Sequence, residues 1–387
     1  MSQEALELFA KFAPGAKPLH MKSHGRLEIV GNHTDHNNGL CLVSGVNMGI
    51  DAYFAKRDDG NVVIKSKGYP VFGFNVTDLA RQESDKGTSL GLTRGVAFKL
   101  VELGYKVGGF TAILESDIFP GAGVSSSACY ESLIVAIFSH LYNEDKVTPL
   151  EMAKVSQFAE AAYFGKPCGL LDQVGTSFGG IDYLDFASTE EPIVFPMSFS
   201  FPLQVVLVNT GGSHAGLTPL YAEIPTDMRH IASTYFGKKS LREVNPDDFY
   251  NHDWSSLPLE DSRAYNRAKH YFEENKRVEK AKEAILNNDM PSFLEAINAS
   301  GESSSKLLKN TMIPGIYEGS PEAALDIARP MLKDGACRVM GGGFAGSIIC
   351  FVPPHKVKEF VSKMKKVYGN KNVVPVEIVD GGPRLVD

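Results

Sequence analysis

The chain has 387 residues, 43% of them hydrophobic, and a formal net charge of −7. This length predicts about two or three domains, and the negative charge argues against a dedicated nucleic-acid or anionic-membrane binder. No apolar run approaches the roughly 18 residues that a membrane span requires, and the N-terminus, with Glu4 and Glu7, lacks the pattern of a signal peptide. We therefore expect a cytoplasmic protein with neither nucleic-acid nor membrane partners.

The first half of the chain is predicted to mix short strands with helices. Asp-Gly at residues 59–60 predicts a hairpin between strands at 52–56 and 62–67. Thr148-Pro149 is typical of a helix start, with Thr as the N-cap and Pro at the first helical position. The other predicted elements are helices at 2–13, 93–103, 128–141 and 149–164 and strands at 27–30, 72–76, 110–115 and 181–186.

The second half begins after a polar segment at 188–197 that carries two prolines, so we place the domain boundary there and predict domains 1–197 and 198–387. Residues 240–262, with the single Trp254, are predicted to be loop. The remaining elements are strands at 203–209, 337–340, 347–352 and 373–378 and helices at 261–287, 290–309 and 356–367. Hairpins in place of strict strand–helix alternation indicate an α+β fold.

A loop rich in glycine and serine, PGAGVSSSACYE (residues 120–131), runs into a predicted helix. Free N–H groups and the helix dipole at such a start attract anions, glycines let the backbone approach a phosphate, and serine hydroxyls reach phosphate oxygens or a metal. Taken alone, the stretch fits an ordinary capped helix equally well.

Several common motifs are excluded. GxxxxGK[ST] is absent, as are the protein-kinase HRD and DFG motifs, HExxH and GxSxG. GxGxxG occurs at Gly341–Gly346, but the apolar, β-branched residues after it predict a strand where a dinucleotide site requires a helix. The five cysteines are scattered without a CxxC pair, so neither a zinc site nor a disulfide framework is indicated, and we expect free thiols in a reducing compartment. They are Cys41, Cys129, Cys168, Cys337 and Cys350.

Three glycine-rich stretches, GRLEIVGNHTDHNNG (25–39), PGAGVSSSACYE and VMGGGFAGSI (339–348), occur in the order of the three motifs of the GHMP small-molecule kinases. The first is similar to the galactokinase signature G-R-x-N-x-I-G-E-H-x-D-Y-x-x-G. PCGLLDQ (167–173), NTGGSHAGLTPLY (209–221) and SGESS (300–304) extend the resemblance over nearly the whole chain. The chain thus resembles the galactokinase family.

This resemblance implies a two-domain α+β fold, with an N-terminal domain like ribosomal protein S5, a ferredoxin-like C-terminal domain and the active site in the cleft between them. It implies ATP and Mg²⁺ as cofactors. Ser127 matches the Mg²⁺ contact. Glu131, one helical turn further on, either shares the metal or an outer-shell water, or only lies on a solvent-exposed face of the helix. The residues matching the phosphate cradle are Gly121, Ala122, Gly123, Val124, Ser125, Ser126 and Ser127.

Two further residues match the family's catalytic pair. Asp172 corresponds to the Asp that accepts or orients the proton of the anomeric hydroxyl. Arg26 corresponds to the Arg that keeps this Asp ionised and offsets charge in the transition state. Judged alone, each is better explained without catalysis, Asp172 as a helix-terminus cap and Arg26 as a surface residue at a strand start, whereas the motif context favours the catalytic roles.

By the same resemblance, Asn32, His33, Asp35, Gly169 and Tyr221 bind the sugar, with Tyr221 placed by the motif that contains His214. Asp35 is expected to span two neighbouring ring hydroxyls.

Three positions depart from the signature: Glu28 replaces Asn, Asn32 replaces Glu and His36 replaces Tyr. Plant galacturonate kinases also lack this Glu and have His after the Asp. Since the family's Glu faces the sugar's C6 hydroxyl, we expect Asn32 to tolerate a carboxylate there.

The leading hypothesis is an ATP-dependent sugar-1-kinase, monomeric or weakly dimeric, that acts on galactose or a relative such as galacturonate. A non-catalytic sugar- and nucleotide-binding regulator and a mevalonate-type kinase are the alternatives. Regulators can lose Asp172, Arg26 or the serine loop, which are intact here, and mevalonate-type kinases lack the HTD sequence. Arg94 is a weaker candidate for a residue near the nucleotide.

Overall fold

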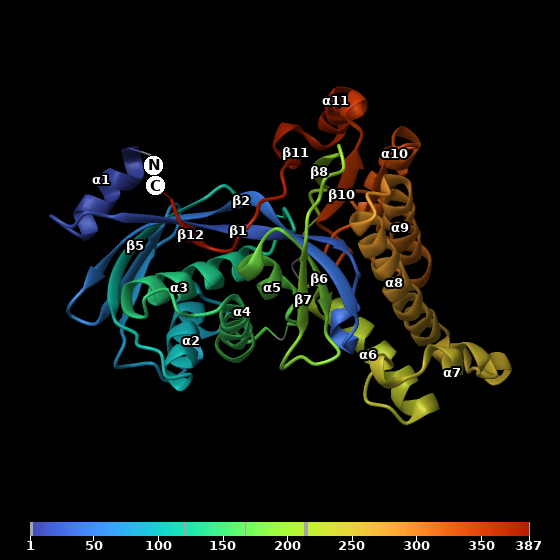
Figure 1. Ribbon diagram of the computed structural model, residues 1–387, viewed down its shortest axis with the longest axis horizontal. Coiled ribbons are helices and arrows are strands. Elements are labelled where there is room, and N and C mark those ends of the chain that lie inside the picture. Colours follow the sequence, from blue (N-terminus) through green and yellow to red (C-terminus); the bar gives the residue numbers. More distant parts are fainter. Residues whose placement is uncertain (1–2, 120, 167, 213–215, 387) are drawn as a thin grey trace.

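The computed structural model describes residues 3–119, 121–166, 168–212 and 216–386. Two β-sheets lie side by side, each covered by helices (Figure 1). Within the described residues the first sheet has eight strands and the second has four. The first sheet contains β1 (Leu19–Val30), β2 (Leu40–Arg57), β3 (Asn61–Ser66), β4 (Val71–Asn75), β5 (Gly109–Ser116), β6 (Ile181–Asp185), β7 (Ile193–Met197) and β12 (Arg384–Leu385). The second contains β8 (Gln204–Asn209), β9 (Ala336–Val339), β10 (Ser347–Val352) and β11 (Val373–Val376).

The first sheet runs in the order β12-β1-β2-β5-β3-β4, and β6 and β7 extend from β2. The predicted hairpin at residues 52–67 is therefore wrong: β5 lies between the two strands, antiparallel to β2 and parallel to β3. The reason is burial, because the first six residues of β5 are buried and require neighbours on both sides. β3 forms its antiparallel pair with β4 instead.

Helices cover both faces of this sheet, as the alternation of side chains along a strand requires. Ala52, Phe54 and Ala112 face a core formed with α2 (Ser89–Glu102), α3 (Ser126–Tyr142) and α4 (Pro149–Phe158). Tyr53 and Ile113, on the opposite face, pack against α1 (Gln3–Phe12). α5 (Leu171–Phe178) packs on the other end of β2, against Cys41 and Val43.

The second sheet is antiparallel in the order β11-β8-β10-β9. Gly341–Gly346 connects β9 to β10, so the prediction of a turn between strands in place of a dinucleotide site is confirmed. One face of the sheet packs on α8 (Ser262–Leu286) and α9 (Met290–Ser303), and the other on α10 (Pro321–Ala328) and α11 (Val357–Tyr368).

The two halves share one hydrophobic core, in which Leu27 and Leu42 from the first sheet meet Leu207 and Phe351 from the second. The boundary predicted at 197/198 lies between β7 and β8, where the chain passes from one sheet to the other. The C-terminal end then returns to the first sheet, where β12 pairs with β1.

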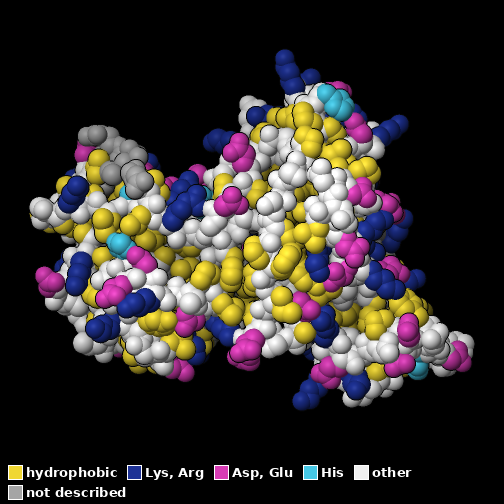
Figure 2. Space-filling view, viewed as in Figure 1, with side chains coloured by type: hydrophobic (Ala, Val, Ile, Leu, Met, Phe, Trp, Pro, Cys, Tyr) yellow, Lys and Arg dark blue, Asp and Glu magenta, His cyan; other side chains and the backbone are white. Residues whose placement is uncertain are grey.

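Residues 240–262 are not wholly loop. They include α7 (Pro246–Asn251), next to α6 (Thr218–Phe236), and Trp254 stacks among the rings of Tyr235, Phe249 and Tyr265. The face of the molecule in Figure 2 shows two lobes, with charges of both signs dispersed between apolar side chains. Among the helices of the described ranges, none has both the length and the apolar character needed to cross a bilayer. All five cysteines are free thiols, as predicted.

Candidate active site

The glycine- and serine-rich loop reaches the sheets from the N-terminal end of α3. Gly121, Gly123 and Ser125 have positive φ angles of 80°, 75° and 56°, which glycine adopts freely. The loop is tied to both sheets, because Arg26 N–H donates to the Val124 carbonyl at 3.0 Å and Ser347 Oγ donates to the Gly121 carbonyl at 2.8 Å. Ser126 is exposed, and the side chain of Ser125, the N-cap residue of α3, makes no capping hydrogen bond within the described residues. The first N–H groups of α3 are therefore available to an anion.

Gly25 is what allows this approach. A Cβ atom at Gly25 would lie 2.6 Å from the Val124 carbonyl oxygen, so any side chain would push the loop away from β1. The register between β1 and β2 shifts between His24 and Gly25, one residue before Arg26. This irregularity lies where the loop, β1 and the predicted active-site Arg meet.

Arg26 and Asp172 form a close ion pair. Nε and Nη2 of Arg26 lie 2.8 and 2.7 Å from Oδ1 of Asp172, and Arg26 Nη1 donates to the Gly123 carbonyl at 2.6 Å. Arg26 is buried, whereas 34% of the Asp172 side chain is exposed. One guanidinium thus links an accessible carboxylate to the glycine-rich loop.

The electrostatic surroundings keep Asp172 ionised. Partial burial raises the pKa of its carboxyl, but the charge of Arg26, a hydrogen bond from Ser125 and the charge of Lys166 outweigh that effect, so the pKa lies below its usual value. At neutral pH the group is a carboxylate, able to accept a proton or to orient a hydroxyl.

The loop's last serine contacts an acidic residue that the sequence did not single out. Ser127 Oγ donates to Oε1 of Glu160 at 3.0 Å. Glu160 lies in a π-helical turn, η3 (Ala159–Phe164), and is 1% exposed. Gln173 Nε2 and Lys166 Nζ bind the same carboxylate at 2.7 and 2.8 Å. A hydroxyl next to a carboxylate is the hard oxygen donor pair that Mg²⁺ prefers.

Glu131, the predicted second metal contact, lies differently. It is fully buried in α3, and neither of its carboxyl oxygens makes a hydrogen bond within the described residues. Burial raises the pKa of its carboxyl well above the usual value, with the nearby charge of Glu160 as a further cause. It is neither an exposed helix-face residue nor the carboxylate that Ser127 contacts, so the geometry favours Glu160.

Asp35 and Gly169 lie against each other. A Cβ atom at Gly169 would be 2.0 Å from Oδ2 of Asp35, so the glycine makes room for the carboxylate. His36 is also close, with Nε2 3.6 Å from Oδ1 of Asp35. The first motif and the PCGLLDQ segment therefore meet, as the resemblance implied.

The third glycine-rich motif forms another wall. The His33 ring donates through Nε2 to the Gly342 carbonyl at 3.0 Å, and the Tyr221 hydroxyl donates to the Gly343 carbonyl at 3.2 Å. Burial is the main cause that lowers the pKa of His33 to about 3, so its ring is neutral. With Nε2 as the donor, Nδ1 is an acceptor, and no described residue pairs with it.

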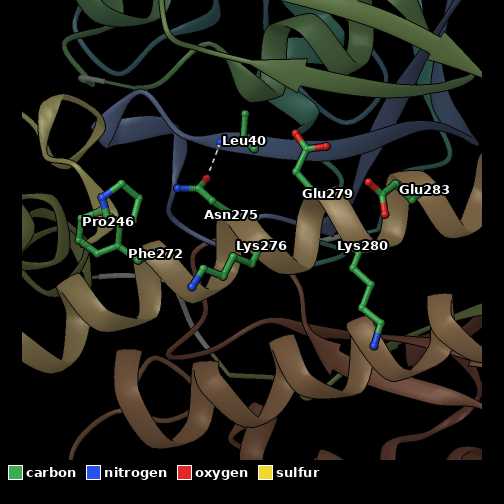
Figure 3. A pocket seen from close by; sticks show the side chains of 8 residues that line it. All are labelled: Leu40, Pro246, Phe272, Asn275, Lys276, Glu279, Lys280 and Glu283. Carbon is green, nitrogen blue, oxygen red and sulfur yellow. Dashed lines mark hydrogen bonds between the residues drawn. The ribbon is translucent and has the colours of Figure 1, made fainter. Parts of the chain in front are cut away.

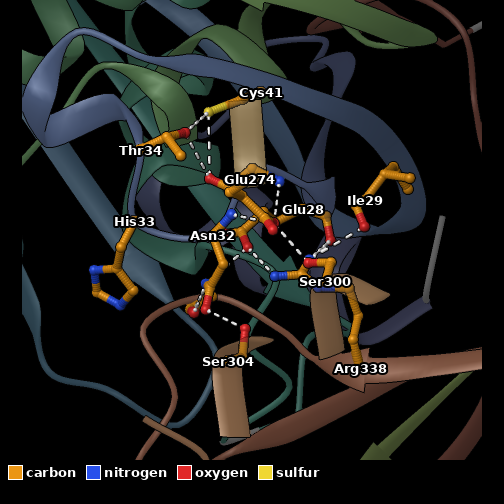
Figure 4. A network of polar contacts seen from close by, with 12 residues as sticks. Glu28, Ile29, Asn32, His33, Thr34, Cys41, Glu274, Ser300, Ser304 and Arg338 are labelled. Atoms are coloured by element: carbon orange, nitrogen blue, oxygen red, sulfur yellow. Dashed lines mark hydrogen bonds and ion pairs between the residues drawn. The ribbon is translucent and has the colours of Figure 1, made fainter. Parts of the chain in front are cut away.

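Asn32, expected to face the sugar, makes its side-chain contacts inside the protein. It is fully buried, and its amide nitrogen donates to Glu28 Oε1 at 2.9 Å and to the Gly341 carbonyl at 2.7 Å (Figure 4). Its amide oxygen accepts from Ser304 and Asn310 at 3.2 and 2.8 Å. All four hydrogen-bonding positions are occupied, so none is left for a ligand.

Two other features lie apart from these contacts. The Arg94 side chain is buried and paired with Asp85, so nothing in its contacts supports a position near the nucleotide. A groove along α8 (Figure 3) contains no predicted site residue. Its lining residues are Leu40, Pro246, Phe272, Asn275, Lys276, Glu279, Lys280 and Glu283. Pro120, Pro167 and His214 fall outside the described residues.

Comparisons with known proteins identify the family. The model of the galactokinase galactose-binding signature matches residues 7–56, and that of the GHMP kinase N-terminal domain matches residues 92–180. A galactokinase of Glaesserella parasuis is 31% identical over 86% of this chain and 85% of its own length. The chain belongs to the galactokinase family. A galactokinase of Limosilactobacillus reuteri, 26% identical, matches over 94% of both chains.

Solved structures show the family fold as well. Lactococcus lactis galactokinase complexed with galactose superposes with a TM-score of 0.85, at 24% identity and 99% coverage of both chains. A mevalonate kinase of L. major gives 0.64 at 15% identity, covering 95% of this chain and 99% of its own. The α+β GHMP kinase fold and the galactokinase type of enzyme are thus confirmed, and with them the use of ATP that the family implies.

Sequence reasoning missed Glu160 and Lys166. The only signal was an acidic residue in the apolar end of a predicted helix, FAEAAYF, directly before GKPCGLLDQ. Nothing in that local pattern indicates that Glu160 meets Ser127, which lies 33 positions earlier.

Proposed function

We propose that this enzyme transfers the γ-phosphate of ATP to the C1 hydroxyl of galactose or a close relative, releasing ADP and the sugar 1-phosphate. The observation that carries the proposal is the position of Arg26, which binds the Asp172 carboxylate and the Gly123 carbonyl of the loop at once. Phosphoryl transfer depends on positioning and on electrostatic stabilisation, and this link fixes the base relative to the phosphates.

In this proposal the loop at residues 121–127 and the start of α3 bind the triphosphate. Ser127 and Glu160 would hold Mg²⁺, whose chemistry is to neutralise phosphate charge. Such a site has few protein ligands, and among the described residues no cluster of three or more His, Cys, Asp and Glu could hold a metal.

The sugar is proposed to bind between the first motif, Gly169 and the third motif. Asp35 accepts hydrogen bonds from ring hydroxyls, and the unpaired Nδ1 of neutral His33 can accept another. Tyr221 Oη lies at the Gly343 carbonyl on the same wall. Burial raises the pKa of Tyr221 to about 12, so it stays a hydroxyl.

Asp172 is proposed to accept the proton of the C1 hydroxyl while the C1 oxygen forms its bond to the γ-phosphorus and the bond from that phosphorus to the bridging oxygen of ADP breaks. Arg26 keeps Asp172 charged beforehand and offsets negative charge on the transferring group. The products are the sugar 1-phosphate, ADP and one proton.

The identity of the sugar is part of the proposal. Galactose is supported by the match to the galactose-binding signature and by the relatives named galactokinase. Galacturonate is the second candidate. His36 beside Asp35 favours it, because plant galacturonate kinases also have His after this Asp. The buried Asn32 does not favour it. The free thiols support a cytoplasmic, reducing location.

The test is sugar-dependent ADP release with ATP and Mg²⁺ across galactose, galacturonate, N-acetylgalactosamine and arabinose. We expect galactose to give the highest kcat/KM and a product phosphorylated at C1. Preference for galacturonate would assign the uronate instead. Absence of turnover on every sugar, in protein that still binds sugar and nucleotide, would leave the regulator as the function.

A further inference from the structure

Lys166 lies at the junction of the candidate phosphate site and the base. Its Nζ is 2.8 Å from Glu160 Oε1, and its backbone N–H donates to the Glu160 carbonyl at 3.0 Å. The side chain is 57% exposed, whereas the carboxylate it binds is 1% exposed. An ammonium group on a solvent-accessible stem therefore covers a buried acid.

The ammonium and the phosphate loop meet at one atom. Oε1 of Glu160 accepts both from Lys166 Nζ and from Ser127 Oγ. The charge of Lys166 also acts on Asp172, where it lowers the pKa of the carboxyl, and on Tyr221. Lys166 is thus close to the loop, the base and the sugar wall.

This contact conflicts with the role proposed for Glu160. The carboxylate is already occupied by Ser127, Gln173 and Lys166, so a cation bound there must displace Lys166. The ammonium would then be unpaired beside the triphosphate, the ligand to which a lysine binds as a point charge. Its exposed stem leaves it free to move.

We propose that Lys166 is a further ATP-binding residue. In the nucleotide-free enzyme its ammonium group neutralises Glu160, and when nucleotide binds the side chain moves so that the ammonium contacts the triphosphate. The inference rests on the proposed function, in which the loop at residues 121–127 holds the triphosphate. If Lys166 only neutralised Glu160, its loss would weaken ATP binding solely while Glu160 is charged, and Lys166→Met would have no effect on ATP affinity in a Glu160→Gln background.

Calorimetric titration of the whole protein with Mg²⁺–ATP, without sugar, tests the proposal without relying on turnover, in the wild-type background and in a Glu160→Gln background. We expect Lys166→Met to weaken Mg²⁺–ATP binding about tenfold in both backgrounds, since one charge-assisted phosphate contact is lost. Lys166→Arg should stay within about threefold of wild type, because it keeps the charge. Galactose affinity, measured in the same variants, should not change.

Lys146→Met is the matched control, because Lys146 is an exposed lysine that also pairs with a glutamate. Wild-type affinity for Mg²⁺–ATP in Lys166→Met would overturn the proposal, as would an equal loss in Lys146→Met or the absence of any loss from Lys166→Met in the Glu160→Gln background. Lys166→Gln repeats the measurement if the Met variant does not fold. If wild-type protein binds no ATP at all, the proposed function fails, and that result is distinct from failure of Lys166 alone.

Discussion

Asn32 donates a hydrogen bond to the carboxylate of Glu28 at 2.9 Å, inside the network of Figure 4. These are two of the three positions at which the chain departs from the family signature. The signature has Asn at position 28 and Glu at position 32, and this chain has the reverse. The carboxylate is therefore at position 28 and the amide at position 32. Arg338 Nη2 pairs with the Glu28 carboxylate at 2.8 Å.

We therefore predict that the two positions are coupled. Glu28→Asn leaves the fully buried Arg338 without its ionic partner, a change that typically costs about 3–5 kcal/mol. Asn32→Glu places a second acid beside Glu28, whose pKa burial already raises. The double exchange restores one acid and one amide, so its free energy of unfolding should exceed that of both single variants. Denaturant unfolding measures these free energies. If the double variant loses as much free energy of unfolding as the two single variants together, the two positions are not coupled.

Replacement of Asp172 by Asn should abolish most turnover and spare nucleotide binding. The amide cannot accept the hydroxyl proton, and a positioned general base contributes about 10²- to 10⁴-fold to the rate. kcat and the dissociation constant for ATP are the two measurements. Asp51→Asn is the control, because Asp51 is a carboxylate paired with Lys22 and His20 away from the loop. Full activity in Asp172→Asn would exclude this Asp as the base.

The acid limb of the pH–rate profile should depend on Arg26. Because the charge of Arg26 holds the pKa of Asp172 below its usual value, Arg26→Met leaves burial as the main effect and raises that pKa. Since the active form is the carboxylate, the fall of kcat/KM on acidification should begin at higher pH in the variant. Arg57→Met, which removes an arginine paired with the exposed Asp59, should leave the limb in place. An unmoved limb in Arg26→Met would show that Asp172 does not govern it.

Matched substitutions at Glu160 and Glu131 test which of the two acids binds Mg²⁺. Glu160→Gln removes the carboxylate next to Ser127, and we expect the Mg²⁺ concentration for half-maximal activity to rise about tenfold or more. Glu131→Gln replaces a fully buried acid that Ser127 does not contact, and its Mg²⁺ requirement should stay within about threefold of wild type. Equal effects, or a larger one at Glu131, would restore Glu131 as the metal contact.

Local patterns predicted those parts of the site whose geometry is local. The glycines of the loop and of the β9–β10 turn set the backbone where they stand, so both turns could be read from the sequence. The family resemblance also predicted that Asp35, Gly169 and Tyr221 bind the sugar. The chain could not reveal β5 between β2 and β3, because strand order depends on which strand needs burial on both sides.

The sequence by itself determined the family and the α+β class, and through the family resemblance it predicted the phosphate loop and that Arg26 acts on Asp172, which the two side chains' ion pair fits. Only the tertiary structure decided which residues Asn32 contacts and that Glu131 is buried. It also decided that Ser127 and Lys166 both contact Glu160. These depend on contacts between segments far apart in the chain, such as Asn32 with Asn310 and Ser127 with Glu160. The role of such a side chain depends on its burial and on its hydrogen-bond partners. Neither can be predicted from the residues next to it in the sequence.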